Sequence, residues 1–219
     1  MPDAGAARPP AIIFDLDGTL IDSAPSLHRA CAAMLAARDL PQPDLATVKT
    51  FVGQGVPTLV RRCLHWAGGP DDPAAFDAFC AIYDADPISG TTVLPGARET
   101  LAALAGARHP LGLCTNKPDA PTRTLLCALS LGPFDAIAGG DTLQVHKPDP
   151  APLLHVMHDL GATAETTIYV GDSRTDWRTA AAAGIRYAHL SGGYETERPP
   201  DDIWRHLQSL HDLTPAMAR

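Results

Sequence analysis

Two aspartates stand two residues apart in the run Ile12-Ile13-Phe14-Asp15-Leu16-Asp17-Gly18-Thr19-Leu20, directly after an apolar segment. Side chains alternate faces along a strand, so Asp15 and Asp17 point the same way beyond its carboxyl end. Two like charges held this close favour a cation between them, and a hard divalent metal suits their oxygens. Gly18 permits a sharp turn against a ligand, and Thr19 offers a hydroxyl and an amide to an anion. The same pattern also occurs in ordinary turns, so its meaning depends on the segments downstream.

A second polar cluster, Thr115-Asn116, follows the apolar residues 111–114. The Thr115 hydroxyl can donate to a phosphoryl oxygen, and Asn116 can orient the same group. Pro118 lies near the start of the next predicted helix, whose first amides are unpaired and attract anions. A turn followed by a helix cap would explain the same residues without any ligand.

A lysine precedes another predicted helix in Val145-His146-Lys147-Pro148-Asp149-Pro150. The two prolines restrict the backbone, so the Lys147 side chain leaves it in a defined direction. An ammonium there would screen the acidic pair and neutralise a transferring anionic group. The alternative is a solvated surface lysine.

Two more acids follow the apolar residues 167–170 in Gly171-Asp172-Ser173-Arg174-Thr175-Asp176. Asp172 stands where the strand ends and is the better direct metal ligand. Asp176 falls in the first turn of the next helix, where it could act through water or orient a ligand. Favourable interaction with the helix dipole would explain Asp176 equally well, but it would not explain Asp172.

Short apolar strands alternate with helices through most of the chain. Strands are predicted at 11–15, 111–114, 135–138, 167–170 and 185–189, and helices at 96–107, 119–130, 149–160 and 174–183. This alternation predicts an α/β fold of Rossmann-like type, a doubly wound parallel sheet with right-handed crossovers. Ligands bind such sheets beyond the carboxyl ends of the strands, where all four polar clusters stand.

The stretch 22–90 interrupts this pattern. It predicts helices at 22–38, 44–52, 55–67 and 73–84, with no convincing strand. We therefore expect a loose tail at 1–10, an α/β core at 11–21 and 91–219, and a small helical cap domain inserted at 22–90.

The composition limits the partners of the protein. A net charge of −8 over 219 residues, without a basic run, disfavours nucleic acid and anionic membranes. The five cysteines form no CxxC pair and are typical of free thiols in a reducing compartment. No apolar run approaches transmembrane length, and no secretory signal is evident, so the cytoplasm is the expected location. Oligomeric state is open between monomer and homodimer.

In order and spacing, the four clusters resemble the motifs of the haloacid dehalogenase superfamily from residue 11 to about residue 193. The resemblance implies that Asp15 attacks phosphorus and forms an aspartyl-phosphate, while Asp17 protonates the leaving oxygen and later deprotonates water. It also implies Mg²⁺ bound by Asp15, the Asp17 backbone carbonyl and Asp172. Asp176 would not bind the ion directly but would act through water or orient a ligand. Thr115 and Lys147 would hold the phosphoryl group, as would Gly18, Thr19 and Asn116. Superfamily dehalogenases lack the second carboxylate, so Asp17 favours phosphoryl transfer.

Within the superfamily, the segments Phe51-Val52-Gly53-Gln54-Gly55 and Leu94-Pro95-Gly96 are similar to those of bacterial phosphoglycolate phosphatases. That similarity implies hydrolysis of 2-phosphoglycolate, a small phosphorylated metabolite, with Gly53, Gln54 and Gly55 lowering over the substrate. The cap cations Lys49, Arg61 and Arg62 are candidates for the glycolate carboxylate, and none is preferred. A phosphatase for another small metabolite or sugar phosphate, a sugar phosphomutase and a non-catalytic binding protein are the alternatives.

Overall fold

The computed structural model describes residues 9–194, 197 and 199–214. The predicted tail at 1–10 therefore lies almost entirely outside the described residues. The central sheet has six parallel strands in the order β5-β4-β1-β6-β7-β8. Its strands are β1 (Ala11–Phe14), β4 (Leu111–Cys114), β5 (Ala136–Ala138), β6 (Thr167–Gly171), β7 (Arg186–Leu190) and β8 (Arg205–Leu207).

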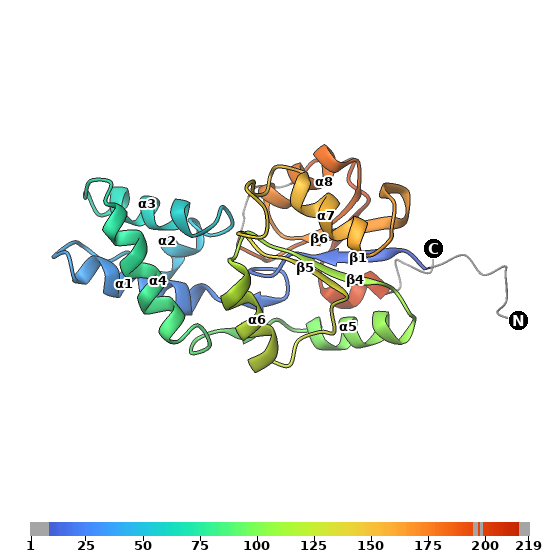
Figure 1. The fold of residues 1–219 in the computed structure, drawn as a ribbon, viewed down its shortest axis with the longest axis horizontal. Helices are drawn as coiled ribbons and strands as arrows, with labels where there is room; N and C mark the ends of the chain where they lie inside the picture. Colours follow the sequence, from blue (N-terminus) through green and yellow to red (C-terminus); the bar gives the residue numbers. More distant parts are fainter. Residues whose placement is uncertain (1–8, 195–196, 198, 215–219) are drawn as a thin grey trace, which may run out of the picture.

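Helices cover both faces of this sheet (Figure 1). Ile12 and Phe14 pack on the face shared with α5 (Ala97–Gly106) and α6 (Asp119–Ala128), while Ile13 packs on the face covered by the other two helices. Those are α7 (Ala151–Asp159) and α8 (Arg174–Ala183), and short 3₁₀ turns follow at Ala164–Thr166 and Leu210–Asp212. Burial on both faces explains why β1 is a continuous apolar run. The predicted doubly wound α/β fold is confirmed.

The chain changes direction across the sheet at β1. From β1 it builds outward through β4 and β5 on one side, then returns to place β6 on the other. In open α/β sheets the crevice at such a reversal is where ligands bind. The residues that follow β1 and β6 therefore meet at this crevice.

The helical stretch 24–85, which follows β1 and precedes α5, packs around a core of its own beside the sheet (Figure 1). Phe79, Met34 and Leu35 are fully buried at its centre, among side chains from all parts of the stretch. Its helices are α1 (Ala24–Ala36), α2 (Leu45–Lys49), α3 (Val56–Trp66) and α4 (Pro73–Ala85). Among the described residues, two buried clusters lie on the faces of the sheet and a third lies in the stretch 24–85, which therefore has hydrophobic stabilisation of its own.

Three short strands were not predicted. β2 (Ile21–Asp22) pairs antiparallel with β3 (Thr92–Val93), so the expectation of no strand from residue 22 onward is wrong at its first residue. The third is β8, which pairs with β7 as the outermost strand on that side of the sheet. Two- and three-residue strands are too short to show an apolar period in sequence. Within the described residues, no helix combines the length and apolar character needed to cross a membrane.

Candidate active site

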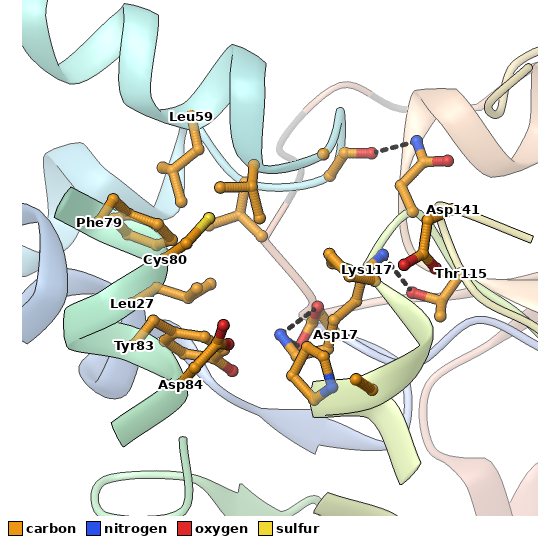
Figure 2. Close-up of a pocket in the computed structure, with 18 of the residues that line it drawn as sticks. Asp17, Leu27, Leu59, Phe79, Cys80, Tyr83, Asp84, Thr115, Lys117 and Asp141 are labelled. Carbon is orange, nitrogen blue, oxygen red and sulfur yellow. Dashed lines mark hydrogen bonds and ion pairs between the residues drawn. The ribbon is translucent and has the colours of Figure 1, made fainter. Parts of the chain in front are cut away.

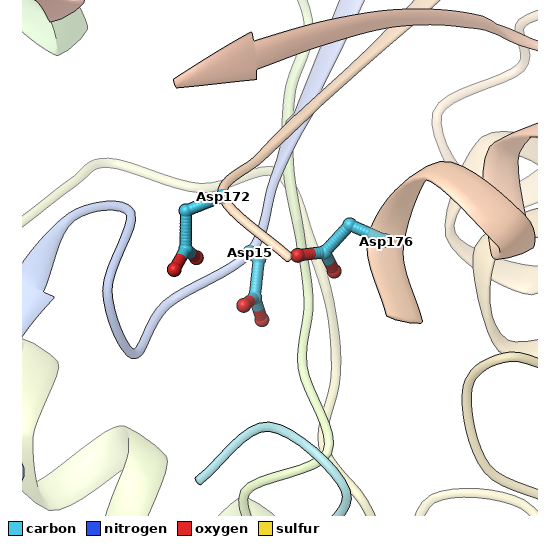
Figure 3. Close-up of side chains that lie close together, drawn as sticks. All are labelled: Asp15, Asp172 and Asp176. Atoms are coloured by element: carbon cyan, nitrogen blue, oxygen red, sulfur yellow. The ribbon is translucent and has the colours of Figure 1, made fainter. Parts of the chain in front are cut away.

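Three buried carboxylates meet beyond the carboxyl ends of β1 and β6 (Figure 3). Asp15 follows β1, Asp172 follows β6, and Asp176 lies in the first turn of α8. Oxygen atoms of all three lie within 4.8 Å of one another. Because β1 and β6 are neighbouring parallel strands, acids far apart in sequence reach the same point.

Lys147 lies against this acidic cluster. Its ammonium donates to Asp15 Oδ1 at 2.8 Å, to Asp176 Oδ1 at 2.7 Å and to the Tyr169 hydroxyl at 2.7 Å. Burial alone would lower the pKa of Lys147, but the Asp15 and Asp176 carboxylates raise it overall. With a side chain only 2% exposed and ion pairs to both carboxylates, Lys147 is a buried group of the site and not a surface lysine.

Asp176 has both carboxylate oxygens engaged. Oδ1 also accepts from the Tyr169 hydroxyl at 2.8 Å, and Oδ2 accepts from the Ser173 backbone N–H and hydroxyl at 3.1 and 2.6 Å. Ser173 caps α8 in return, because its hydroxyl accepts from the Asp176 backbone N–H at 3.2 Å. This geometry suits Asp176 to orient Lys147 and leaves Asp15 and Asp172 as the better direct metal ligands.

The cluster carries more negative charge than Lys147 neutralises. Burial, together with the Asp176 charge, raises the pKa of Asp15 to about 7, although Lys147 acts in the opposite direction. Burial and the charges of Asp176 and Asp15 raise the pKa of Asp172 well above its usual range. Of the three, the pKa of Asp176 alone is lowered: burial acts to raise it, but Lys147 and the hydrogen bonds from Ser173 and Tyr169 together outweigh that effect. Two buried carboxylates that resist ionisation are a site for a further cation.

Asp172 is held in place from two sides. Its Oδ1 accepts from the Thr19 hydroxyl at 2.8 Å, and its Oδ2 accepts from the Tyr194 backbone N–H at 2.8 Å. Gly18 and Gly193 leave the room for this carboxylate, since a Cβ on either would overlap it. Gly18 also has φ of 90°, which favours glycine. Thr19 thus reaches the site as predicted, but its hydroxyl orients Asp172 instead of facing a ligand.

Asp17 enters a separate ion pair. Lys117 Nζ donates to both Asp17 carboxylate oxygens, at 3.1 and 3.0 Å, and the Ser23 hydroxyl donates to Oδ1 at 2.5 Å. The two charged side chains are 3% and 12% exposed. Burial acts to lower the pKa of Lys117, but Asp17 and the neighbouring Tyr83 raise it overall. Metal ligation by the Asp17 backbone carbonyl stays a prediction.

Asn116 connects three parts of the site. Its amide nitrogen donates to the Gly53 carbonyl at 3.1 Å and to the Lys147 carbonyl at 3.0 Å, and its Oδ1 accepts from the Lys147 backbone N–H at 3.0 Å. These bonds make Asn116 a clamp on the Lys147 loop. The Thr115 hydroxyl accepts from the Lys117 backbone N–H at 3.2 Å and remains beside the cavity.

A cavity of about 370 Å³ separates the helical stretch from the carboxyl ends of the central strands, here called the sheet edge (Figure 2). Asp15, Asp17 and Lys117 line its core side, while Gly53 and Gly55 border it from the loop before α3. The opposite wall is largely apolar and includes Leu27, Val52, Val56, Leu59, Phe76, Phe79 and Cys80, with the polar exceptions Tyr83 and Asp84. Among the described residues that line this cavity, Gln54 is absent; its side chain is exposed and accepts from Arg62 at 3.0 Å.

Sequence reasoning missed Lys117, Tyr169 and Tyr194 as parts of the site. Lys117 follows the predicted strand end directly, so its position was a usable signal, but its partner stands 100 residues away. The Tyr169 hydroxyl lies inside an apolar strand pattern, which is typical of a packing residue. Nothing in the sequence around Tyr194 indicates that its hydroxyl binds Asp22 at 2.8 Å.

The donor set fits Mg²⁺. Asp15 and Asp172 offer hard carboxylate oxygens, both resist carrying charge without a further cation, and both are buried against water. Within the described residues, no histidine or cysteine joins these acids to form a softer ligand set. The acidic cluster is therefore the place where the expected metal would bind.

The family model for haloacid dehalogenase-like hydrolases matches residues 12–190. The chain belongs to this family. It is 46% identical over 198 residues to a phosphoglycolate phosphatase of Rhodospirillum rubrum, a match that covers 86% of this chain and 82% of that protein. It is 43% identical over 216 residues to a phosphoglycolate phosphatase of Cereibacter sphaeroides, covering 96% and 98%.

The fold is shared with solved structures of the family. The crystal structure of a predicted phosphoglycolate phosphatase from Haemophilus somnus superposes with a TM-score of 0.87 at 28% identity, covering 96% of this chain and 99% of that one. The resemblance recognised in the four sequence motifs is thus confirmed, both in sequence and in architecture.

Proposed function

We propose that this chain is a Mg²⁺-dependent phosphomonoester hydrolase that converts 2-phosphoglycolate to glycolate and phosphate. The observation that carries the proposal is that Asp15 and Asp17 line one cavity but have different cationic partners. Asp15 accepts a hydrogen bond from Lys147, whereas Asp17 accepts from Lys117. Two carboxylates in different electrostatic settings are suited to different roles, one as nucleophile and one as acid and base. The relatives named phosphoglycolate phosphatase support the choice of substrate.

In the first step, an Asp15 oxygen attacks phosphorus, and the bond from phosphorus to the glycolate oxygen breaks. Asp17 donates a proton to that leaving oxygen, which yields glycolate and an aspartyl-phosphate. In the second step, Asp17 takes a proton from water as the water oxygen attacks phosphorus. The bond from phosphorus to Asp15 then breaks, which releases phosphate and restores both carboxyl groups.

The remaining residues hold charge and geometry. Lys147 lies within hydrogen-bond distance of Asp15, so it can neutralise phosphoryl oxygens next to the nucleophile. Thr115 borders the same cavity and can donate to one of those oxygens. Asp15, Asp172 and the Asp17 carbonyl would hold Mg²⁺, which supplies further positive charge to the phosphoryl group. Asp176 positions Lys147, and Asn116 clamps its loop.

The decisive experiment measures phosphate release from 2-phosphoglycolate and a panel of sugar phosphates, with Mg²⁺ and with EDTA. We expect turnover of 2-phosphoglycolate that EDTA abolishes and Mg²⁺ restores. A large kcat/KM preference for a sugar phosphate would reject the substrate but keep the mechanism. Phosphoryl transfer within a sugar phosphate, without free phosphate, would instead identify a phosphomutase.

The setting of the enzyme follows from the same proposal. We expect it to work in the cytoplasm on small phosphorylated metabolites, as a monomer or homodimer, without a nucleic-acid or membrane partner. The net charge of −8 supports this choice, because substrate attraction then depends on the local cations of the site.

A further inference from the structure

Lys117 and Tyr83 meet across the boundary between the sheet edge and the helical stretch. The Lys117 ammonium lies 5.0 Å from the ring centroid of Tyr83, which stands near the end of α4. Both residues line the 370 Å³ cavity, and Figure 2 shows Lys117 beside Asp17 with Tyr83 on the facing helix. A cation and a phenol therefore border the same space next to the proposed acid and base.

The Tyr83 hydroxyl is a buried donor without an acceptor among the described residues. The residue is 3% exposed, and its oxygen forms no well-aligned hydrogen bond, although the Lys117 ammonium lies close enough to interact with it. An unsatisfied buried hydroxyl is costly, and native proteins rarely retain one unless a ligand or water completes it. At this position the missing partner would be a hydrogen-bond acceptor that also faces the Lys117 ammonium.

The other charged groups around the cavity restrict where a second anion can lie. Asp84 and Asp141 line it as well and repel a carboxylate. The cap cations expected from sequence do not line this cavity. Lys49 borders a smaller space beside Asp15 and Asp172 and pairs with Asp22 at 3.2 Å, and Arg62 donates to Gln54 at 3.0 Å. Arg61 lies on the outer face of the helical stretch, beside Val60 and Leu64. Among the described residues that line the 370 Å³ cavity, Lys117 is thus the cation that an anion would meet.

We propose that Lys117 and Tyr83 form the subsite for a second anionic group of the substrate, a carboxylate, and that its binding releases Asp17 from Lys117. Without such a group, Lys117 holds both Asp17 oxygens, which keeps the carboxylate from the leaving oxygen. A substrate carboxylate takes over the ammonium and accepts from the Tyr83 hydroxyl. Once released, Asp17 can take up a proton from water and donate it to the leaving oxygen, so the subsite selects substrates through the rate of the chemical step. This inference rests on the proposed function.

The test compares 2-phosphoglycolate with 2-hydroxyethyl phosphate, which lacks the carboxylate. In the wild-type enzyme we expect kcat/KM to favour 2-phosphoglycolate by about 10- to 100-fold, the range of a charge-assisted hydrogen bond. Lys117→Met should lose this preference and raise kcat for 2-hydroxyethyl phosphate, because Asp17 is no longer paired. Tyr83→Phe should lower kcat/KM for 2-phosphoglycolate by about tenfold. Arg61→Met is the matched control and should leave the preference unchanged.

A preference that survives in Lys117→Met, or an equal loss on both substrates, would overturn the subsite. If Lys117→Met does not fold, the wild-type enzyme still decides the matter through inhibition. The subsite then requires 3-phosphonopropionate to bind at least about tenfold more tightly than propylphosphonate, and equal affinities reject it. Failure of the proposed function is distinct, since neither phosphomonoester would then release phosphate with Mg²⁺.

Discussion

The sheet edge and the helical wall across the cavity hold their polar groups in opposite ways. At the edge, buried charges interlock: Lys147 and Asp176 are 2% and 0% exposed, and each binds several partners. The wall is built mainly of apolar side chains such as Leu59 and Phe79. Preorganised charge stabilises a transition state, whereas an apolar wall excludes water and shapes the space beside it. We therefore assign the chemical steps to the charged residues at the sheet edge. Substrate selection falls to the boundary between the sheet edge and the helical wall.

The largest effect is expected at the edge. Asp15→Asn removes the proposed nucleophile, so kcat should fall on the order of 10⁴-fold or more, as when other covalent nucleophiles are removed. The fold should persist, because an amide oxygen can still accept from Lys147 and a buried charge is lost. Phosphate release and thermal unfolding measure the two properties. Residual turnover close to that of the wild type would show that the edge does not supply the nucleophile.

The wall should respond in stability instead. Phe79→Ala empties a fully buried site in the core of the helical stretch and should cost about 3–5 kcal/mol of unfolding free energy. Because that core is separate from the two clusters of the sheet, its loss should first loosen the helices. Hydrogen exchange resolved along the chain would detect it as faster exchange in α1 to α4 than in β1 and β6. Equal loss of protection in both regions would mean that they unfold as one unit.

Magnesium binding at the edge should depend on pH. The fold raises the pKa of Asp15 from 3.8 to about 7, so the protonated carboxyl favours the folded protein. This stabilisation is fully present below pH 3.8 and is lost as pH rises through about 7. Mg²⁺ binds the ionised form, and its apparent affinity should weaken by about tenfold for each pH unit below 7. The stabilisation by MgCl₂ in thermal unfolding should therefore be larger at pH 8 than at pH 6. A shift independent of pH would contradict this arrangement of charges.

The smallest effect comes from a pair of glycines. A Cβ on Gly193 would overlap the Asp172 carboxylate, so Gly193→Ala should displace that group and lower kcat/KM by about tenfold, the equivalent of one lost hydrogen bond. Gly106, the last residue of α5, has open space around its Cβ position. Gly106→Ala should keep full activity and stabilise the protein by up to about 1 kcal/mol. Equal activities of the two variants would argue against tight seating of Asp172.

The sequence predicted the sheet edge better than the wall. Asp15 and Asp172 follow apolar strands, and the topology of parallel sheets brings strand ends together, so their meeting follows from local pattern alone. The partner of Lys117 does not follow, because no periodicity links it to Asp17 across 100 residues. Gln54 shows the same limit in reverse: the family resemblance implies a site residue, yet its side chain accepts a hydrogen bond from Arg62. Side-chain pairing across the cavity depends on how the helices pack, which sequence spacing does not encode.

The central place of β1 has a consequence for how the chain is made. β1 is synthesised before the other strands of the sheet, but one of its two neighbours, β6, ends only at Gly171. The core of the helical stretch, by contrast, draws on described residues between Leu27 and Tyr83, and all of these leave the ribosome before β4. We expect the helices to condense while β1 still waits unpaired, since short-range contacts form faster than distant ones. During translation the helical wall of the cavity would thus form before the carboxylate cluster of β1 and β6. A chain interrupted ahead of β6 would expose β1 as an apolar strand prone to aggregation.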